Sequence, residues 1–149
     1  RKVALVSQTT KNIDELMKFS AELQAMVVPD GGEFRLCNTI CEPTTERQNA
    51  LRRMVSEVDL VLAIGGIKSS NTARLADVGN QMGVTSYHIE RPEDIKAEWL
   101  QGIGNVGVTA GASTPDDVIE EVVAYLAERG FTPPEGGVRP VDPDYVPAY

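Results

Sequence analysis

Two loops of this chain carry small polar side chains in a pattern that suits the binding of phosphate groups. One is Ser69-Ser70-Asn71-Thr72, and the other is Ala110-Gly111-Ala112-Ser113-Thr114; each follows an apolar stretch and precedes a helical pattern. Backbone N–H groups are free at the start of a helix, and hydroxyl or amide side chains beside them add further donors for an anion. The two loops together therefore predict a receptor for a ligand with two phosphates.

A third segment, residues 38–44, adds a thiol ahead of another helical pattern that we expect to run from Thr45 to Ser56. It contains Cys41, and Cys37 lies four residues earlier. A pair at this spacing is weak evidence for zinc, because a tetrahedral site needs four ligands and the single histidine, His88, is distant in the sequence. We expect Cys37, at an apolar strand position, to be a small buried residue. Cys41 is then the better candidate for chemistry.

Each loop also has a purely structural interpretation, because Ser, Thr and Asn favour the N-cap position of helices. Thr114 is expected to cap the last helix, with Pro115 at its first position and two acidic residues complementing the helix dipole. Capping leaves the bare backbone at Gly111 and the spare hydroxyl of Ser113 unexplained, and three polar residues at 69–71 exceed what one cap requires. From spacing alone, capping and phosphate binding both remain open.

The elements that carry these loops alternate between strands and helices. Residues 59–64 are almost continuously apolar, which is typical of a parallel strand covered on both faces. The alternation predicts an α/β fold with a Rossmann-like, three-layer parallel sheet. Ligands bind beyond the carboxyl ends of the strands in such sheets, so residues 7–10, 65–71 and 109–113 should face the site. Residues 92–100 are expected to form one short helix.

Composition excludes several classes of function. The chain has 149 residues and a net charge of −8, which argues against a nucleic-acid partner. No apolar run of about 18 residues is present, so no membrane span is expected. The start lacks the shape of a secretory signal, and we expect a cytoplasmic protein without disulfides. Because the chain enters a strand almost at Arg1, we expect it to be part of a larger polypeptide.

Four segments in this order closely resemble the 4-hydroxy-3-methylbut-2-enyl diphosphate reductase (LytB/IspH) family. The match runs from residue 1 to about residue 130. Its segments are Val6-Ser7-Gln8-Thr9-Thr10; Asn38-Thr39-Ile40-Cys41 with Thr44 and Arg47-Gln48; Gly65-Gly66 with Ser69-Ser70-Asn71-Thr72; and residues 107–113. One such motif would be weak, but four in order are specific.

The resemblance implies an iron–sulfur enzyme of the non-mevalonate isoprenoid pathway, built from three α/β lobes in a trefoil-like arrangement. Such enzymes reductively remove the allylic hydroxyl of their diphosphate substrate to give isopentenyl and dimethylallyl diphosphates. Each lobe supplies one cysteine to a [4Fe–4S] cluster, and reduced ferredoxin or flavodoxin would supply the electrons. Cys41 matches the third cluster cysteine, and either Thr9 or Thr10 matches a threonine near the substrate hydroxyl. The residues matching the rest of the substrate site are Thr44, Ser69, Ser70, Asn71 and Ser113.

The resemblance also marks what this chain lacks. Residues 1–38 match the end of the second lobe and residues 39–130 the third, whereas the first lobe and most of the second have no counterpart. With them are missing two cluster cysteines, the diphosphate-binding histidines and a proton-supplying glutamate, so we expect the isolated chain to be inactive. Residues 131–149 form a Pro-rich tail that is expected to be extended or disordered. A different class remains open: a non-catalytic phosphate-binding α/β module that has lost the cluster.

Overall fold

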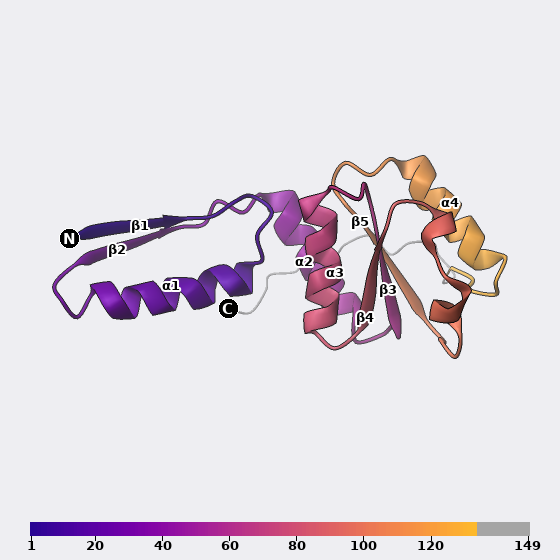
Figure 1. The fold of residues 1–149 in the computed structure, drawn as a ribbon, viewed down its shortest axis with the longest axis horizontal. Helices are drawn as coiled ribbons and strands as arrows, with labels where there is room; N and C mark the ends of the chain where they lie inside the picture. Colours follow the sequence, from indigo (N-terminus) through magenta and orange to yellow (C-terminus); the bar gives the residue numbers. More distant parts are fainter. Residues whose placement is uncertain (134–149) are drawn as a thin grey trace. The chain divides into compact units, whose positions relative to one another are not determined.

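The computed structural model of the chain describes residues 1–133 (Figure 1). Most of the predicted Pro-rich tail, residues 134–149, lies outside the described residues. The described part of the chain divides into two compact units, the first of residues 1–45 and the second beginning at Glu46. Among the described residues, no helix combines the length and the apolar character needed to cross a bilayer.

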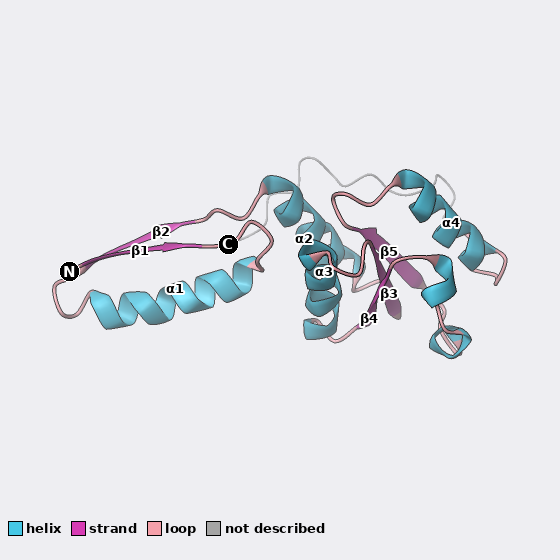
Figure 2. Cartoon of the chain, turned by 45° about the horizontal axis from the view of Figure 1, so that its top comes forward, coloured by secondary structure: helices cyan, strands magenta, loops and turns pink. Residues whose placement is uncertain are grey.

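The first unit is built mainly from two parallel strands and the helix between them in the sequence (Figure 2). Strands β1 (Lys2–Val6) and β2 (Glu33–Cys37) pair in register from Lys2 opposite Glu33 to Val6 opposite Cys37. Helix α1 (Ile13–Val27) packs on this pair. Its N-cap, Asn12, is almost fully buried and accepts a hydrogen bond from the Asp14 backbone N–H at 2.8 Å.

The expectation that Cys37 is buried is wrong, because the structure places it on an exposed face of β2. Side chains of a strand alternate between its two faces. Cys37 therefore shares a face with the charged Glu33 and Arg35, which are also exposed, whereas Phe34 and Leu36 on the other face are half-buried. The period of two, rather than the hydrophobicity of the thiol, decides its position.

The second unit confirms the predicted α/β fold. Its parallel sheet has the order β4-β3-β5, with β3 (Leu60–Ile64) in the centre between β4 (Thr85–Ile89) and β5 (Val106–Ala110). Every residue of β3 is buried. Central position and burial on both faces explain why this segment is apolar without alternation.

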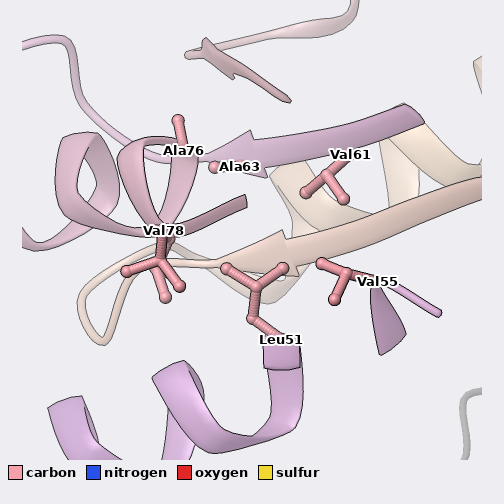
Figure 3. Close-up of a cluster of buried hydrophobic side chains, with 7 residues drawn as sticks. Leu51, Val55, Val61, Ala63, Ala76 and Val78 are labelled. Carbon is pink, nitrogen blue, oxygen red and sulfur yellow. The ribbon is translucent and has the colours of Figure 1, made fainter. Parts of the chain in front are cut away.

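Helices cover the sheet of the second unit on both faces and complete the three layers. The helices are α2 (Glu42–Met54), which begins in the first unit and continues into the second, α3 (Ser70–Gln81) and α4 (Asp116–Ala127). The cluster on one face of β3 joins α2 and α3 to the sheet and contains Leu51, Val55, Val61, Ala63, Leu75, Ala76 and Val78 (Figure 3). The cluster on the other face joins α4 and contains Leu60, Leu62, Ile64, Ile89, Ile95, Val122 and Leu126.

The predicted helix over residues 92–100 is replaced by two short 3₁₀ helices, η1 (Pro92–Asp94) and η2 (Ala97–Leu100). The chain between them is extended at Ile95, whose side chain is 4% exposed and belongs to the core beside α4. The break between the two short helices therefore coincides with the residue of this segment that joins the core.

Replacing the central residue of β3 tests the importance of this core. Leu62→Ala should lower the free energy of unfolding by about 2–5 kcal/mol, because it removes a fully buried side chain and leaves a cavity. The measurement is urea denaturation of the chain. Ile67→Ala, at an apolar residue that is 67% exposed, is the control and should change stability by no more than about 0.5 kcal/mol. Equal losses for the two variants would contradict this description of the core.

Candidate functional site

The two predicted phosphate loops lie side by side in the second unit, at the carboxyl ends of two paired strands. Strands β3 and β5 are neighbours, with Ile64 opposite Ala110 at their ends. The loop after β5 is tied to the end of β3 because Gly111 N–H and the Thr114 hydroxyl both donate to the Ile64 carbonyl oxygen, at 2.9 and 2.8 Å. The expectation that both loops share one edge of a sheet is therefore confirmed.

Thr72 marks the point where the two loops meet. It lies in the first turn of α3 and is fully buried. A Cβ atom built on Gly65 or on Gly111 would overlap Thr72 Oγ1, and the one on Gly111 would lie 3.7 Å from Ser69 Oγ. Glycine is therefore required at both positions to let the ends of β3 and β5 approach this threonine. The sequence patterns assigned Thr72 no role of its own. The signal that could have identified it is its position in the first turn after the Gly65-Gly66 pair.

The first loop combines a helix cap with additional donors. Ser69 is the N-cap of α3, and its Oγ accepts hydrogen bonds from Thr72 N–H at 3.3 Å and from Thr72 Oγ1 at 2.9 Å. The capping interpretation is thus correct for Ser69. The cap does not need Ser70, which is exposed, or Asn71, which is half-buried. These two residues are the polar side chains that the sequence showed beyond the needs of one cap.

The second loop does not cap its helix as predicted. Helix α4 has Pro115 at its N-cap, and no side chain caps it, so the expected N-cap role of Thr114 and first-turn position of Pro115 are wrong. The Thr114 hydroxyl instead donates to the Ile64 carbonyl oxygen, which holds this side chain at the end of β3 and anchors the loop there. Ser113 and Ala112 are left exposed at the tip of the loop.

The candidate cysteine lies in the first unit, directly before α2. Cys41 is half-buried, its N–H donates to the Thr9 carbonyl oxygen at 3.1 Å, and its Sγ lies 3.0 Å from Thr44 Oγ1. Thr44 is 2% exposed. The structure thus brings Thr9, Cys41 and Thr44 together. Thr10 is half-buried in the same loop. The hydrogen bond between this loop and Cys41 is made by the carbonyl oxygen of Thr9.

One residue that joins the loops of the first unit was not singled out from the sequence. Thr39 Oγ1 accepts a hydrogen bond from Ser7 N–H at 2.9 Å and donates to the Ser7 carbonyl oxygen. It thereby connects the segment after β1 to the segment after β2. Its position could have been found from the pairing, since parallel strands bring their carboxyl ends together and Thr39 follows β2 by two residues.

The described residues contain two free thiols, Cys37 and Cys41, but no complete set of ligands for a metal centre. Among residues 1–133, no three His, Cys, Asp or Glu side chains are grouped so that they could hold a metal ion. His88 lies in the second unit, where its Nε2 is 2.9 Å from the Gly65 carbonyl oxygen. This part of the chain therefore does not by itself fit a [4Fe–4S] cluster, although Cys41 fits as one ligand.

Comparison with known proteins decides the family. The family model described as LytB protein matches residues 1–127. The chain belongs to the LytB family. The resemblance of its four segments is thereby confirmed.

Curated proteins with similar sequences include several bacterial reductases. It is 42% identical over 128 residues to a protein of Geobacter sulfurreducens, a match that covers 86% of this chain and 44% of the relative. It is 43% identical over 129 residues to a protein of Colwellia psychrerythraea, with 87% and 41% covered. Both relatives are named 4-hydroxy-3-methylbut-2-enyl diphosphate reductase. The chain spans less than half the length of these relatives.

Solved structures of the LytB family agree with the fold. One is (E)-4-hydroxy-3-methyl-but-2-enyl diphosphate reductase, the terminal enzyme of the non-mevalonate pathway, which is 38% identical in sequence and has a TM-score of 0.57. The match covers 85% of this chain and 44% of that protein. A second is the Plasmodium falciparum reductase, with a TM-score of 0.79 and 24% sequence identity. The match covers 99% of this chain and 47% of that protein, and at this identity it shows the fold alone.

A substitution at Gly111 tests the close packing of the two loops. Gly111→Ala should lower the free energy of unfolding by about 1–3 kcal/mol, because its Cβ would overlap the buried Thr72 Oγ1. Gly66→Ala is the matched control, since its Cβ would meet only Glu90 Oε1, at an ordinary 3.7 Å. Urea denaturation of both variants gives the comparison. Equal stability of the two would show that Thr72 does not fill the space between the loops.

Proposed function

We propose that this chain is the C-terminal part of an iron–sulfur reductase that dehydroxylates 4-hydroxy-3-methylbut-2-enyl diphosphate to isopentenyl and dimethylallyl diphosphates. The observation that carries the proposal is its 42% identity to a reductase of that name over 86% of the chain. Residues 1–38 would end the second lobe of the enzyme and residues 39–130 would form the third. The isolated chain would be inactive.

The two loops of the second unit would hold the diphosphate group. Ser69, Ser70 and Asn71 stand at the start of α3, where backbone N–H groups and the positive end of the helix dipole favour an anion. Ser113 is exposed on the second loop. The two loops meet at Thr72, which lies close to both Gly65 and Gly111. Anchoring the diphosphate end in this way would fix one end of the substrate and so reduce the entropy lost before reaction.

In the first unit, Cys41 would provide one of three cysteine ligands to the [4Fe–4S] cluster, and the other two would come from the remainder of the protein. The Thr44 hydroxyl lies 3.0 Å from Cys41 Sγ and could donate a hydrogen bond to this sulfur when it is bound to the metal. The bound cluster would supply a Lewis acid for the departing oxygen and a path for electrons. Thr44, together with Thr9 or Thr10, would line the hydroxyl end of the substrate. Reduced ferredoxin or flavodoxin would be the electron donor, in the cytoplasm.

A second candidate is a phosphate-binding module without catalytic activity. It is favoured by one observation, the lack of a grouped set of metal ligands among residues 1–133. The two proposals differ in whether the polypeptide encoded by the complete reading frame holds iron.

Iron and acid-labile sulfide content after anaerobic reconstitution separates these candidates. The polypeptide encoded by the complete reading frame should hold a [4Fe–4S] cluster, whereas the 149-residue chain alone should hold none and should not turn over substrate with a reduced dye. Cys41→Ser should abolish the cluster, and Cys37→Ser, at an exposed thiol, should leave it intact. A complete polypeptide without iron would favour the module, and turnover by the isolated chain would refute its predicted inactivity.

The binding of inorganic pyrophosphate tests the two loops separately from the cluster. Ser69→Ala and Ser113→Ala should each weaken binding about ten-fold, the effect of losing one hydrogen bond to a charged group. The dissociation constant is measured from amide chemical shifts in an NMR titration of the chain. Ser56→Ala, which removes an exposed hydroxyl bonded to Arg53 at the end of α2, is the control and should bind like the wild type. Unchanged affinity in both loop variants would remove these serines from the site.

A further inference from the structure

We propose that Thr72 is a positioning residue that directs the hydroxyl proton of Ser69 toward the bound diphosphate. The inference rests on the proposed function, because it concerns the same phosphate site. Thr72 itself is fully buried and is assigned no contact with the ligand. Its effect would pass through Ser69.

The argument begins with the confinement of the Thr72 side chain. Its Oγ1 fills the space that a Cβ on Gly65 or on Gly111 would occupy, so the ends of β3 and β5 both border it. A β-branched side chain in a helix has few rotamers, and threonine commonly turns its hydroxyl toward the preceding turn. Here that hydroxyl meets Ser69 Oγ, three residues earlier, at 2.9 Å. A fully buried hydroxyl needs a partner, so this bond should persist.

The second step is the hydrogen-bonding capacity of Ser69. A serine hydroxyl has one proton to donate and two lone pairs that accept. Ser69 Oγ accepts from Thr72 N–H at 3.3 Å and from Thr72 Oγ1 at 2.9 Å. Both lone pairs are then used by the same residue, and the Ser69 proton must point away from Thr72. The hydroxyl is thereby fixed as a donor, which is the role that an anion requires.

Preorganisation follows from this arrangement. Without the Thr72 hydroxyl, one lone pair of Ser69 becomes available and its proton can rotate to other partners. Binding a diphosphate would then require fixing that rotation again, which reduces affinity. Thr72 would therefore matter for ligand binding through its hydroxyl, and its methyl group would matter only for packing.

The experiment compares Thr72→Ser with Thr72→Ala, since both lose the methyl group and only the second loses the hydroxyl. The dissociation constant of inorganic pyrophosphate is measured by NMR titration of the chain. Thr72→Ser should bind within about two-fold of the wild type, and Thr72→Ala about three- to ten-fold more weakly, as expected for one neutral hydrogen bond. In a Ser69→Ala background, the two Thr72 variants should bind equally, because the residue through which Thr72 acts is gone.

This design separates positioning from a structural role. Equal affinity of Thr72→Ser and Thr72→Ala with Ser69 present would overturn the inference. An equal loss from Thr72→Ala with and without Ser69 would also overturn it, because the hydroxyl would then act independently of Ser69. If Thr72→Ala does not fold, Thr72→Val replaces it as the variant without a hydroxyl.

Two further outcomes distinguish the inference from the proposed function. Pyrophosphate binding that is unaffected by Ser69→Ala would overturn the inference alone, since Ser113 and the rest of the site could still hold the ligand. No binding by the wild-type chain would overturn the assignment of these loops to the diphosphate, and the inference with it.

Discussion

The burial of β3 on both faces is the constraint on which the rest of the second unit depends. Its five residues are buried, so its position is fixed by a core on each side. Because it is central, its carboxyl end can anchor the loop of its neighbour: the Ile64 carbonyl oxygen accepts from both Gly111 N–H and Thr114 Oγ1. Strand pairing and these two hydrogen bonds therefore set the position of the second loop relative to the end of β3.

This site would hold a charged ligand with neutral groups. Lys68 is the one basic residue in the two loops, and it is exposed. The loops instead combine glycine, which allows close approach, with hydroxyl and amide side chains at a helix start. Such dipoles are oriented by the fold before the ligand arrives, so little reorganisation opposes binding. The same reasoning explains why a chain of net charge −8 can belong to a family whose curated members are named for a diphosphate substrate.

The sequence was sufficient where the signal was local or periodic. The nearly continuous apolarity of residues 59–64 predicted a buried parallel strand, and the strand–helix alternation placed both loops on one edge of the sheet. For Cys37 the sequence did contain the right signal, because the alternate residues Glu33 and Arg35 mark its face of the strand as polar. The prediction of burial gave more weight to the hydrophobicity of cysteine than to this alternation. Ile95 shows a signal that was not available, because the break between η1 and η2 follows from a core contact with distant residues.

The two predicted caps show why helix-start motifs and binding loops are hard to separate in a sequence. Ser69 does cap α3, yet the residue whose N–H it accepts also donates its own hydroxyl, and this second bond is what leaves the serine proton directed outward. Thr114 has the same local signature, but its hydroxyl bonds to a carbonyl 50 residues earlier, and α4 begins without a side-chain cap. The Thr72 hydroxyl lies in space left by two glycines, and the Ile64 carbonyl oxygen lies at the end of a paired strand. Neither hydrogen bond can be read from the helix-start motif alone. A motif can therefore identify hydroxyls at a helix start, but the tertiary contacts determine whether each one caps the helix, anchors a loop or faces a ligand.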